Sequence, residues 1–124
     1  MTAPLMGVVV GHGAVAEALV GAAEEISGVR GALIPVTNLG ADRAALERRV
    51  IEAVGDNRAI VFVDLPSGSC LFAAMRGLSA RDNVRVVTGV NLVMLLDFLF
   101  HREEEIAQVA RRAAEAGARA IAER

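Results

Sequence analysis

The sequence predicts an α/β fold with a doubly wound, mostly parallel sheet of about four strands and helices on both of its faces. Four short, almost purely apolar runs at 5–10, 31–36, 59–64 and 84–88 are typical of strands that are buried on both faces. Stretches of helical periodicity separate these runs, and this alternation favours parallel strands joined by crossover helices. At 124 residues, the chain is expected to form one domain over 1–124.

The first half of the chain alternates two strands with two helices. After the strand at 5–10, apolar residues recur at helical spacing over 15–26. After the strand at 31–36, a second amphipathic stretch is expected to begin at Asp42, whose side chain can cap a helix, and to end at Gly55. Each helix is therefore expected to return the chain to the start of the next parallel strand.

The second half repeats the alternation, but its end is ambiguous. The strand at 59–64 leads through a turn of small residues into a short helix, and the strand at 84–88 leads into an apolar helix at 92–100. A last amphipathic helix is expected to end at Gly117, because glycine commonly terminates helices. The tail 118–124 fits either a continuation of this helix or a short antiparallel final strand.

Composition excludes several classes of protein. With 54% apolar and 23% charged residues, the chain is too apolar to be disordered. Nucleic-acid binding is not expected, because the net charge is −2 and the chain has four Phe but no Trp or Tyr for stacking on bases. The longest apolar stretch, 92–100, is short and interrupted by Asp97, so no membrane insertion is expected. No secretory signal is expected either, because no basic residue precedes the first apolar run, so the sequence predicts a cytoplasmic protein.

Candidate functional residues follow the first and third strands. Open parallel sheets bind ligands beyond the carboxyl ends of their strands, near the point where the strand order reverses. His12 follows the first strand, Asp64 ends the third, and the turn Ser67-Gly68-Ser69 leads from the third strand into a helix. If these two strands are neighbours, the imidazole and the carboxylate project into one crevice.

His12 lies between Gly11 and Gly13, which leave room for a reactant to approach its ring. Near neutral pH an imidazole can act as nucleophile or base, and a carboxylate on one ring nitrogen would leave the other nitrogen free to attack. Asp64 ends an apolar run, so its carboxylate must lie at the edge of the sheet or find a partner. The alternatives are a solvent-facing histidine in a tight turn and an aspartate that caps the next turn.

The turn at Ser67, Gly68 and Ser69 opens a helix, where free N–H groups and the positive end of the helix dipole suit a phosphoryl group. The alternative is an ordinary serine N-cap. Cys70 is either a nucleophile near a helix start or a small buried hydrophobe. His101 is expected to be a solvated surface residue without a partner, and two histidines in such different contexts do not indicate a metal site. No cofactor is predicted.

Three sequence motifs together resemble the IIA domain of the mannose family of the sugar phosphotransferase system (PTS). They are Gly-His-Gly at 11–13, Val-Asp-Leu-Pro-Ser-Gly-Ser at 63–69 and Gly-Val-Asn-Leu-Val-Met-Leu at 89–95. The similarity spans essentially the whole chain, with the motifs in the family's order. It implies a phosphotransferase component that acts as a phosphohistidine carrier and is not a stand-alone turnover enzyme. Its implied partners are an HPr-like phosphodonor protein and a IIB-type acceptor protein in sugar uptake or its regulation.

The resemblance also implies roles for individual residues. His12 matches the phosphorylated histidine, Asp64 its hydrogen-bonding carboxylate, and Ser69 the serine at the phosphate-binding helix start, with Ser67 and Gly68 in the turn. Family members are often homodimers that exchange the last strand. The tail at 118–121 would be that strand here.

Three positions depart from the family pattern. Ser67 stands where a glycine is usual, Cys70 near where a proline is common, and Val93 in place of a frequent proline. Two related alternatives therefore stay open: a regulatory phosphohistidine module and a phosphotransfer subunit of the kind that serves dihydroxyacetone kinase. The least favoured alternative is a hydrolase with Ser69 or Cys70 as nucleophile, His12 as base and Asp64 as orienter, since no Gly-x-Ser-x-Gly elbow is present.

Overall fold

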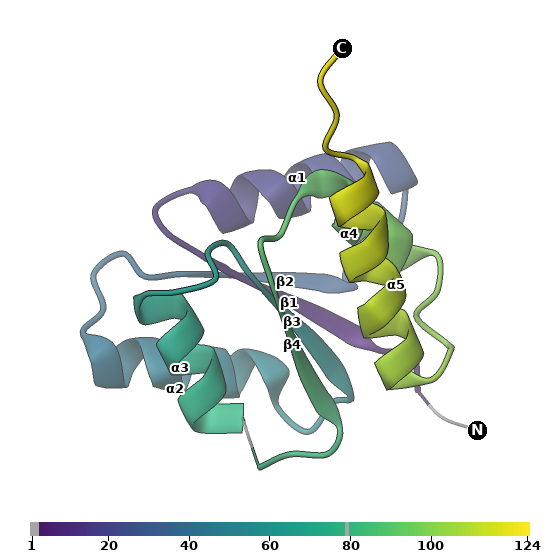
Figure 1. The fold of residues 1–124 in the computed structure, drawn as a ribbon. Coiled ribbons are helices and arrows are strands. Elements are labelled where there is room, and N and C mark those ends of the chain that lie inside the picture. Colours follow the sequence, from purple (N-terminus) through teal and green to yellow (C-terminus); the bar gives the residue numbers. More distant parts are fainter. Residues whose placement is uncertain (1–2, 79) are drawn as a thin grey trace.

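The computed structural model describes residues 3–78 and 80–124, which form a four-stranded sheet between two layers of helices (Figure 1). All strands are parallel and follow the order β2-β1-β3-β4. They are β1 (Met6–Gly11), β2 (Leu33–Thr37), β3 (Ala59–Val63) and β4 (Val84–Thr88). This arrangement confirms the α/β fold and the parallel sheet predicted from the four apolar runs.

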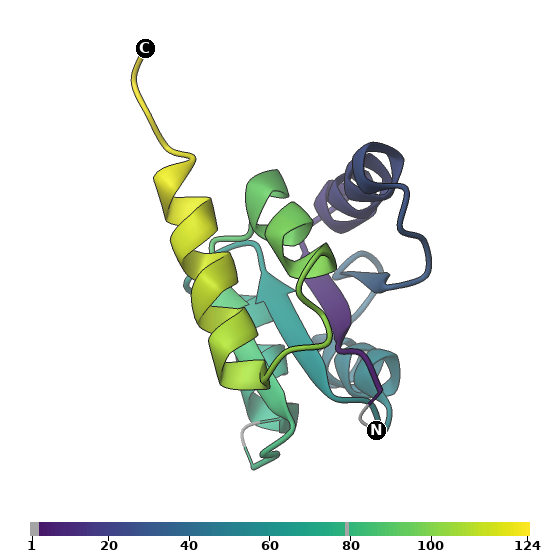
Figure 2. The same ribbon diagram turned by 90° about the vertical axis from the view of Figure 1, so that its right-hand side faces the viewer.

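Helices cover both faces of the sheet (Figures 1 and 2). They are α1 (Val15–Ser27), α2 (Arg43–Val54), α3 (Ser69–Leu78), α4 (Leu92–Leu99) and α5 (Ile106–Arg119). Side chains of α1, α4 and α5 share one hydrophobic core, and those of α2 and α3 share the other. Within the described ranges, no helix is long and apolar enough to cross a membrane.

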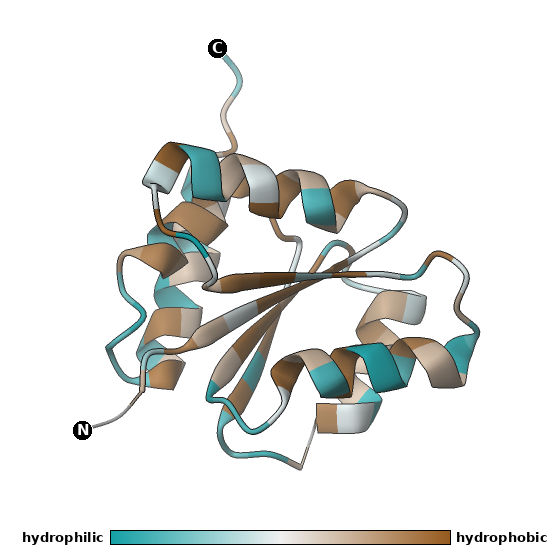
Figure 3. Ribbon diagram, turned by 180° about the vertical axis from the view of Figure 1, so that it is seen from behind, coloured by the Kyte–Doolittle hydropathy of each residue, from teal (hydrophilic) through white to brown (hydrophobic). Residues whose placement is uncertain are grey.

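Alternate residues of the central strands enter these two separate cores. Ile60 and Phe62 pack on the side of α1, α4 and α5, whereas Val8, Val61 and Val63 pack on the side of α2 and α3. All five side chains are fully buried, and Figure 3 shows the hydrophobic colouring that runs along the central strands. Because helices cover both faces, β1 and β3 have no polar face, which explains their continuous apolar runs.

The reversal of strand order between β1 and β3 determines where a ligand can bind. β2 lies on one side of β1, and β3 and β4 lie on the other, so the carboxyl ends of β1 and β3 are where a sheet of this kind binds ligands. Val10 and Val63 are register partners, and the N–H of Asp64 donates to the carbonyl of Val10 at 3.1 Å. The residues that follow these two strands therefore leave the sheet side by side.

The boundaries of α2 agree with the prediction from sequence. The side chain of Asp42 accepts a hydrogen bond from the N–H of Ala45 at 2.8 Å, and Gly55 follows the last residue of the helix. An equivalent cap starts α4, where the side chain of Asn91 accepts from the N–H of Met94 at 3.0 Å. Side-chain caps of this kind satisfy N–H groups that have no partner within their own helix.

The end of α5 differs from the prediction, because the helix continues through Gly117 to Arg119. Gly117 is buried against α4, and a Cβ atom at this position would lie 2.9 Å from Cε of Met94 and 3.2 Å from Oδ1 of Asn91. The side chain of Asn91 also donates to the carbonyl of Gly117 at 3.0 Å. Close packing of two helices therefore explains this glycine, which the sequence pattern had indicated as a helix end.

The tail after α5 forms no strand in this single chain. Figure 1 shows residues 120–124 extending away from the body of the molecule, and Ile121 is 81% exposed. Of the strand implied at 118–121, the first two residues belong to α5. A strand needs a neighbour for its backbone groups, and within the described residues β4 pairs with β3 alone.

Candidate functional site

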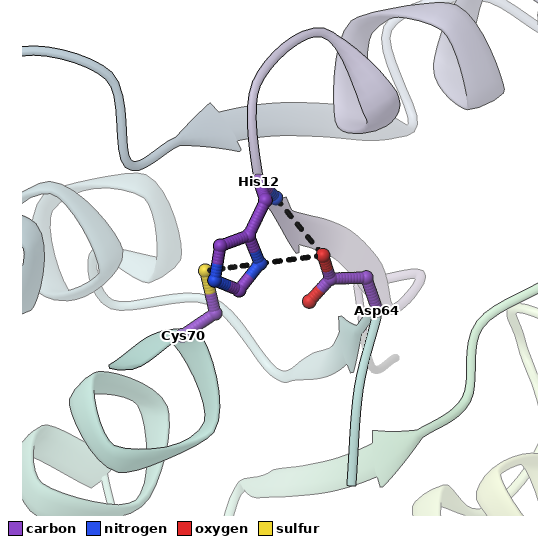
Figure 4. Close-up of side chains that lie close together, drawn as sticks. All are labelled: His12, Asp64 and Cys70. Atoms are coloured by element: carbon purple, nitrogen blue, oxygen red, sulfur yellow. Dashed lines mark hydrogen bonds and ion pairs between the residues drawn. The ribbon is translucent and has the colours of Figure 1, made fainter. Parts of the chain in front are cut away.

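His12 and Asp64 form a hydrogen-bonded pair at the point where the strand order reverses (Figure 4). His12 follows β1 directly, and Asp64 follows β3 directly. Oδ2 of Asp64 accepts from Nδ1 of His12 at 2.8 Å and from the backbone N–H of His12 at 2.9 Å. The other oxygen, Oδ1, accepts from the N–H of Leu65 at 2.9 Å. Both carboxylate oxygens are therefore occupied, and the imidazole has a defined orientation.

The hydrogen bond to Asp64 determines which ring nitrogen of His12 is free. An ionised carboxylate can only accept, so Nδ1 carries the proton and Nε2 keeps a lone pair. The side chain of His12 is 40% exposed, whereas that of Asp64 is 13% exposed. The arrangement thus leaves Nε2 as the nucleophilic nitrogen of a partly exposed ring, while the carboxylate of Asp64 holds Nδ1.

The hydrogen bonds of Asp64 also control its charge. Burial on its own raises the pKa of the carboxyl group. This effect is outweighed by the hydrogen bonds from the backbone and ring of His12, by the attraction to that ring and by the hydrogen bond from the N–H of Leu65. The pKa of Asp64 therefore lies below its ordinary value of 3.8. Asp64 is ionised at neutral pH and favours a positive charge on the imidazole.

The turn at Ser67, Gly68 and Ser69 lies exposed beside the histidine. Gly68 has a φ of +94°, a conformation that side chains with a Cβ rarely adopt, so this position requires glycine. Ser69 is the first residue of α3, and its hydroxyl oxygen lies 3.5 Å from Nε2 of His12. The N–H groups in the first turn of a helix have no intrahelical acceptor, so this end of α3 is suited to hold an anion close to Nε2.

Cys70 is the third side chain in contact with the pair, although it is fully buried. Its sulfur lies 3.7 Å from Nδ1 of His12, and in Figure 4 the line between these two atoms crosses the imidazole ring. Burial first, and then the charge of Asp64, raise the pKa of the Cys70 thiol to about 11. A neutral thiol that faces an occupied nitrogen is a poor nucleophile, so the geometry gives no support to a cysteine hydrolase.

Two residues at the end of β2 support the site and were missed by sequence reasoning. The side chain of Asn38 accepts from the N–H of Gly13 at 3.0 Å, and the hydroxyl of Thr37 donates to the carbonyl of Gly13 at 2.8 Å. Gly13 itself has a φ of +61°. Both the N–H and the carbonyl of Gly13, the residue after His12, are therefore hydrogen-bonded to side chains at the end of β2. The sequence offered one indication of their role: Thr37 and Asn38 stand at the carboxyl end of β2, the strand that lies beside β1.

The family of the chain follows from a model described as the PTS system fructose IIA component, which matches residues 7–115. The chain belongs to this family. The matched region contains all five residues singled out from the sequence, from His12 to Ser69. The resemblance inferred from the three motifs is thereby confirmed, and the protein is a component of the phosphotransferase system.

Solved structures of PTS IIA proteins share the fold. The mannose/sorbose specific IIA subunit from Enterococcus faecalis has a TM-score of 0.85 at 21% identity, and the match covers 98% of this chain and 95% of that one. Component EIIA from Streptococcus agalactiae has a TM-score of 0.81 at 21% identity, covering 96% of each chain. A IIA protein associated with a fucose utilization operon in Streptococcus pneumoniae reaches 0.74 at 22% identity, covering 93% of each. A search of curated proteins found no match.

The structure explains why this IIA-family chain tolerates two of its departures from the pattern. Ser67 does not have a positive φ, so position 67 does not require the glycine that is usual there. Val93 lies in the first turn of α4 and is 42% exposed. Proline is tolerated in the first turn of a helix because its missing N–H would have no partner there, so a residue with an N–H fits equally well.

His101 differs from the prediction that it is a solvated residue without a partner. Its side chain is only 25% exposed, Nδ1 donates to the carbonyl of Asp97 at 2.7 Å, and Nε2 accepts from Arg112. The contacts arise because the turn after α4 brings His101 against α5. The backbone carbonyl of the neighbouring Arg102 accepts from the N–H of Leu5, the residue before β1. This segment therefore lies at the amino ends of the strands, away from the IIA site.

Proposed function

We propose that this IIA-family chain is a cytoplasmic phosphocarrier that functions as a single domain over 1–124. His12 accepts a phosphoryl group from an HPr-like phosphodonor protein and passes it to a IIB-type acceptor protein. The observation that carries the proposal is the hydrogen bonding of one ring: Asp64 accepts from Nδ1, while Nε2 has only the Ser69 hydroxyl at 3.5 Å beside it on a side chain that is 40% exposed. This is the arrangement that a histidine nucleophile needs at neutral pH.

The transfer follows from the positions of the site groups. The lone pair of Nε2 attacks the phosphorus, an N–P bond forms on His12, and the bond to the donor's nitrogen breaks with its electron pair remaining on the donor. The ring of His12 becomes positively charged because Nδ1 keeps its proton, and the ionised Asp64 stabilises that charge. The hydroxyl of Ser69 and the N–H groups that begin α3 lie where the phosphoryl oxygens gather charge.

The return step uses the same groups. A histidine or cysteine of the acceptor attacks the phosphorus from the opposite side, the N–P bond on His12 breaks, and its electrons return to Nε2. Two large proteins must therefore reach one nitrogen in turn, which requires an open site. Exposed apolar side chains on segments that begin at this edge of the sheet suit such docking: Val15, Leu65, Phe72 and Val93.

A homodimer would complete the sheet. The outer edge of β4 has no strand beside it within the described residues, while the tail at 120–124 extends away from its own chain. We propose that the tail of one chain pairs with β4 of a second copy and reciprocally. Strand exchange of this kind satisfies backbone groups that a single chain leaves to solvent.

The experiment that tests the phosphocarrier is intact mass measured after incubation with phosphoenolpyruvate, enzyme I and HPr. We expect one added phosphoryl group, labile to acid and stable to base. The matched controls are His12→Ala, which should gain nothing, and His101→Gln, which should be phosphorylated like the natural chain because His101 lies away from the site. Absence of added mass in the presence of active upstream proteins would rule out HPr as the donor and with it the proposed function.

A further inference from the structure

Cys70 gives the site a third side chain of the kind that binds metal ions. Its sulfur, a ring nitrogen of His12 and a carboxylate oxygen of Asp64 all lie within 4.8 Å of one another, and Sγ is 3.7 Å from Nδ1. The three residues come from three elements, namely the ends of β1 and β3 and the start of α3. Figure 4 shows all three side chains converging on the same space. The phosphotransfer mechanism uses the histidine and the aspartate but has no role for the thiol.

We propose that Nδ1 of His12, a carboxylate oxygen of Asp64 and Sγ of Cys70 together bind a zinc-class divalent cation. One nitrogen, one oxygen and one sulfur ligand form a donor set that zinc accepts, whereas magnesium and calcium prefer oxygen ligands alone. Three protein ligands leave a fourth position, which water or an exogenous ligand occupies in an open tetrahedral site.

The distances between the ligand atoms are close to those that zinc requires. With bonds of about 2.3 Å to sulfur and about 2.0 Å to nitrogen or oxygen, tetrahedral zinc separates its ligand atoms by about 3.3 to 3.6 Å. The Nδ1–Oδ2 distance of 2.8 Å lies slightly inside this range, and the Sγ–Nδ1 distance of 3.7 Å lies slightly outside it. The third distance, from Sγ to the carboxylate oxygen, is within 4.8 Å, so the side chains must rotate about their own bonds to close on the ion.

Binding replaces two protons with the metal. One is the proton that Nδ1 donates to Asp64, and the other is the thiol proton of Cys70; both pass to solvent. The cation then offsets the negative charges of the carboxylate and the thiolate, which would repel each other at this separation in its absence. Of the three ligands, His12 is 40% exposed and Cys70 is fully buried, so the ion would lie between the surface and the core.

The consequence for phosphorylation rests on the proposed function, although metal binding itself does not. A cation on Nδ1 withdraws electron density from the ring and removes the hydrogen bond by which Asp64 stabilises a positive imidazole. Phosphorylation at Nε2 would add positive charge to a ring that already binds a cation. The metal-bound form should therefore resist phosphorylation, so that free zinc lowers the flow of phosphoryl groups through this chain.

The direct test is a titration of the purified, reduced full chain with Co²⁺, followed by displacement with Zn²⁺. We expect one ion per chain and a thiolate-to-cobalt charge-transfer band in the near-ultraviolet. Cys70→Ala and Cys70→Ser should each abolish the band and weaken zinc binding by at least about 100-fold, because loss of even an outer-shell partner typically costs 10–100-fold. His101→Gln, which removes the other histidine, should leave both the band and the affinity unchanged.

Two results would overturn the metal site. One is a natural chain that shows no charge-transfer band while its circular dichroism is that of a folded protein. The other is binding that is equally tight in both cysteine variants, or that is lost in His101→Gln, because the ion would then lie elsewhere.

A second measurement separates this inference from the proposed function. The rate of phosphorylation is measured with and without Zn²⁺, and the ratio of the two rates is compared between the natural chain and Cys70→Ala. We expect saturating zinc to slow the phosphorylation of the natural chain and to slow that of the variant much less. A chain that binds cobalt through Cys70 but is never phosphorylated would contradict the phosphocarrier alone. Equal inhibition of both chains would contradict the link between the metal and phosphorylation.

Discussion

A single oxygen of Asp64 holds both the backbone and the ring of His12, because Oδ2 accepts from the N–H at 2.9 Å and from Nδ1 at 2.8 Å. The carboxylate therefore joins the residues that follow β1 and β3, and it also selects the nitrogen that remains nucleophilic. Its structural and chemical roles can be separated, because a neutral amide can keep part of the hydrogen bonding but not the charge.

Asp64→Asn should slow the phosphorylation of His12 without unfolding the protein. The amide keeps one acceptor oxygen in place of two, and the charge that stabilises the phosphorylated ring is lost. We expect a rate lower by about 100-fold or more, the scale on which general acid–base and orienting groups act. The rate is measured by intact mass over time, with circular dichroism to verify the fold.

The matched control for this variant is Asp56→Asn. Asp56 is an exposed carboxylate just beyond α2, so the substitution removes the same charge at a distance from the pair. It should leave the rate unchanged. Full transfer rates in Asp64→Asn would remove the carboxylate from the mechanism, and equal slowing in both variants would indicate an effect of net charge alone.

The lowered pKa of Asp64 predicts how its contribution to stability depends on pH. A carboxyl group with a lower pKa in the folded state than its ordinary 3.8 stabilises the fold above that value, and the contribution is lost as pH falls through the folded pKa. The difference in free energy of unfolding between the natural chain and Asp64→Asn should be largest near neutral pH and shrink as the pH falls below 3.8. Urea unfolding at several pH values measures it. A difference independent of pH would mean that the ionised form of Asp64 gains nothing from its partners.

The backbone conformation of Gly68 gives a third prediction. Gly68→Ala should destabilise the protein by about 1–2 kcal/mol, because a φ of +94° is strained for a residue with a Cβ. Gly21→Ala is the matched substitution: Gly21 is exposed in α1, and a Cβ there meets nothing within 4 Å. It should stabilise the protein by about 0.5–1 kcal/mol. Thermal unfolding of the two variants measures both effects, and shifts of the same sign would contradict the assignment of strain to Gly68.

The fold and the central pair were predictable because they depend on short-range patterns and one topological rule. Helices cover both faces of β1 and β3, so their sequences are continuously apolar, and an ionisable residue directly after such a run is conspicuous. The carboxyl ends of neighbouring parallel strands meet at one edge, so His12 and Asp64 had to lie close together once the strands were adjacent.

The contacts that were not predicted depend on packing between elements. Gly117 has the sequence signature of a helix end, yet its reason is the approach of Met94 from another helix. The short distance between Sγ of Cys70 and Nδ1 of His12 depends on the direction in which α3 leaves the turn. The hydrophobic pattern of the sequence does not predict that direction. Asn38 supports Gly13 through a single hydrogen bond across two strands, and a polar residue after a strand is too common to indicate this.

The end of the chain offers a last prediction, because the tail is either a free extension or the missing edge strand of a dimer. Removal of residues 121–124 should leave the described helices and sheet intact, since α5 ends at Arg119, Ala120 caps it and Ile121 is 81% exposed. If the tail pairs with β4 of a second copy, the full chain should sediment as a dimer and the shortened chain as a monomer with the same circular dichroism. A full chain that sediments as a monomer, or a shortened chain that remains a dimer, would show that the tail does not build the interface.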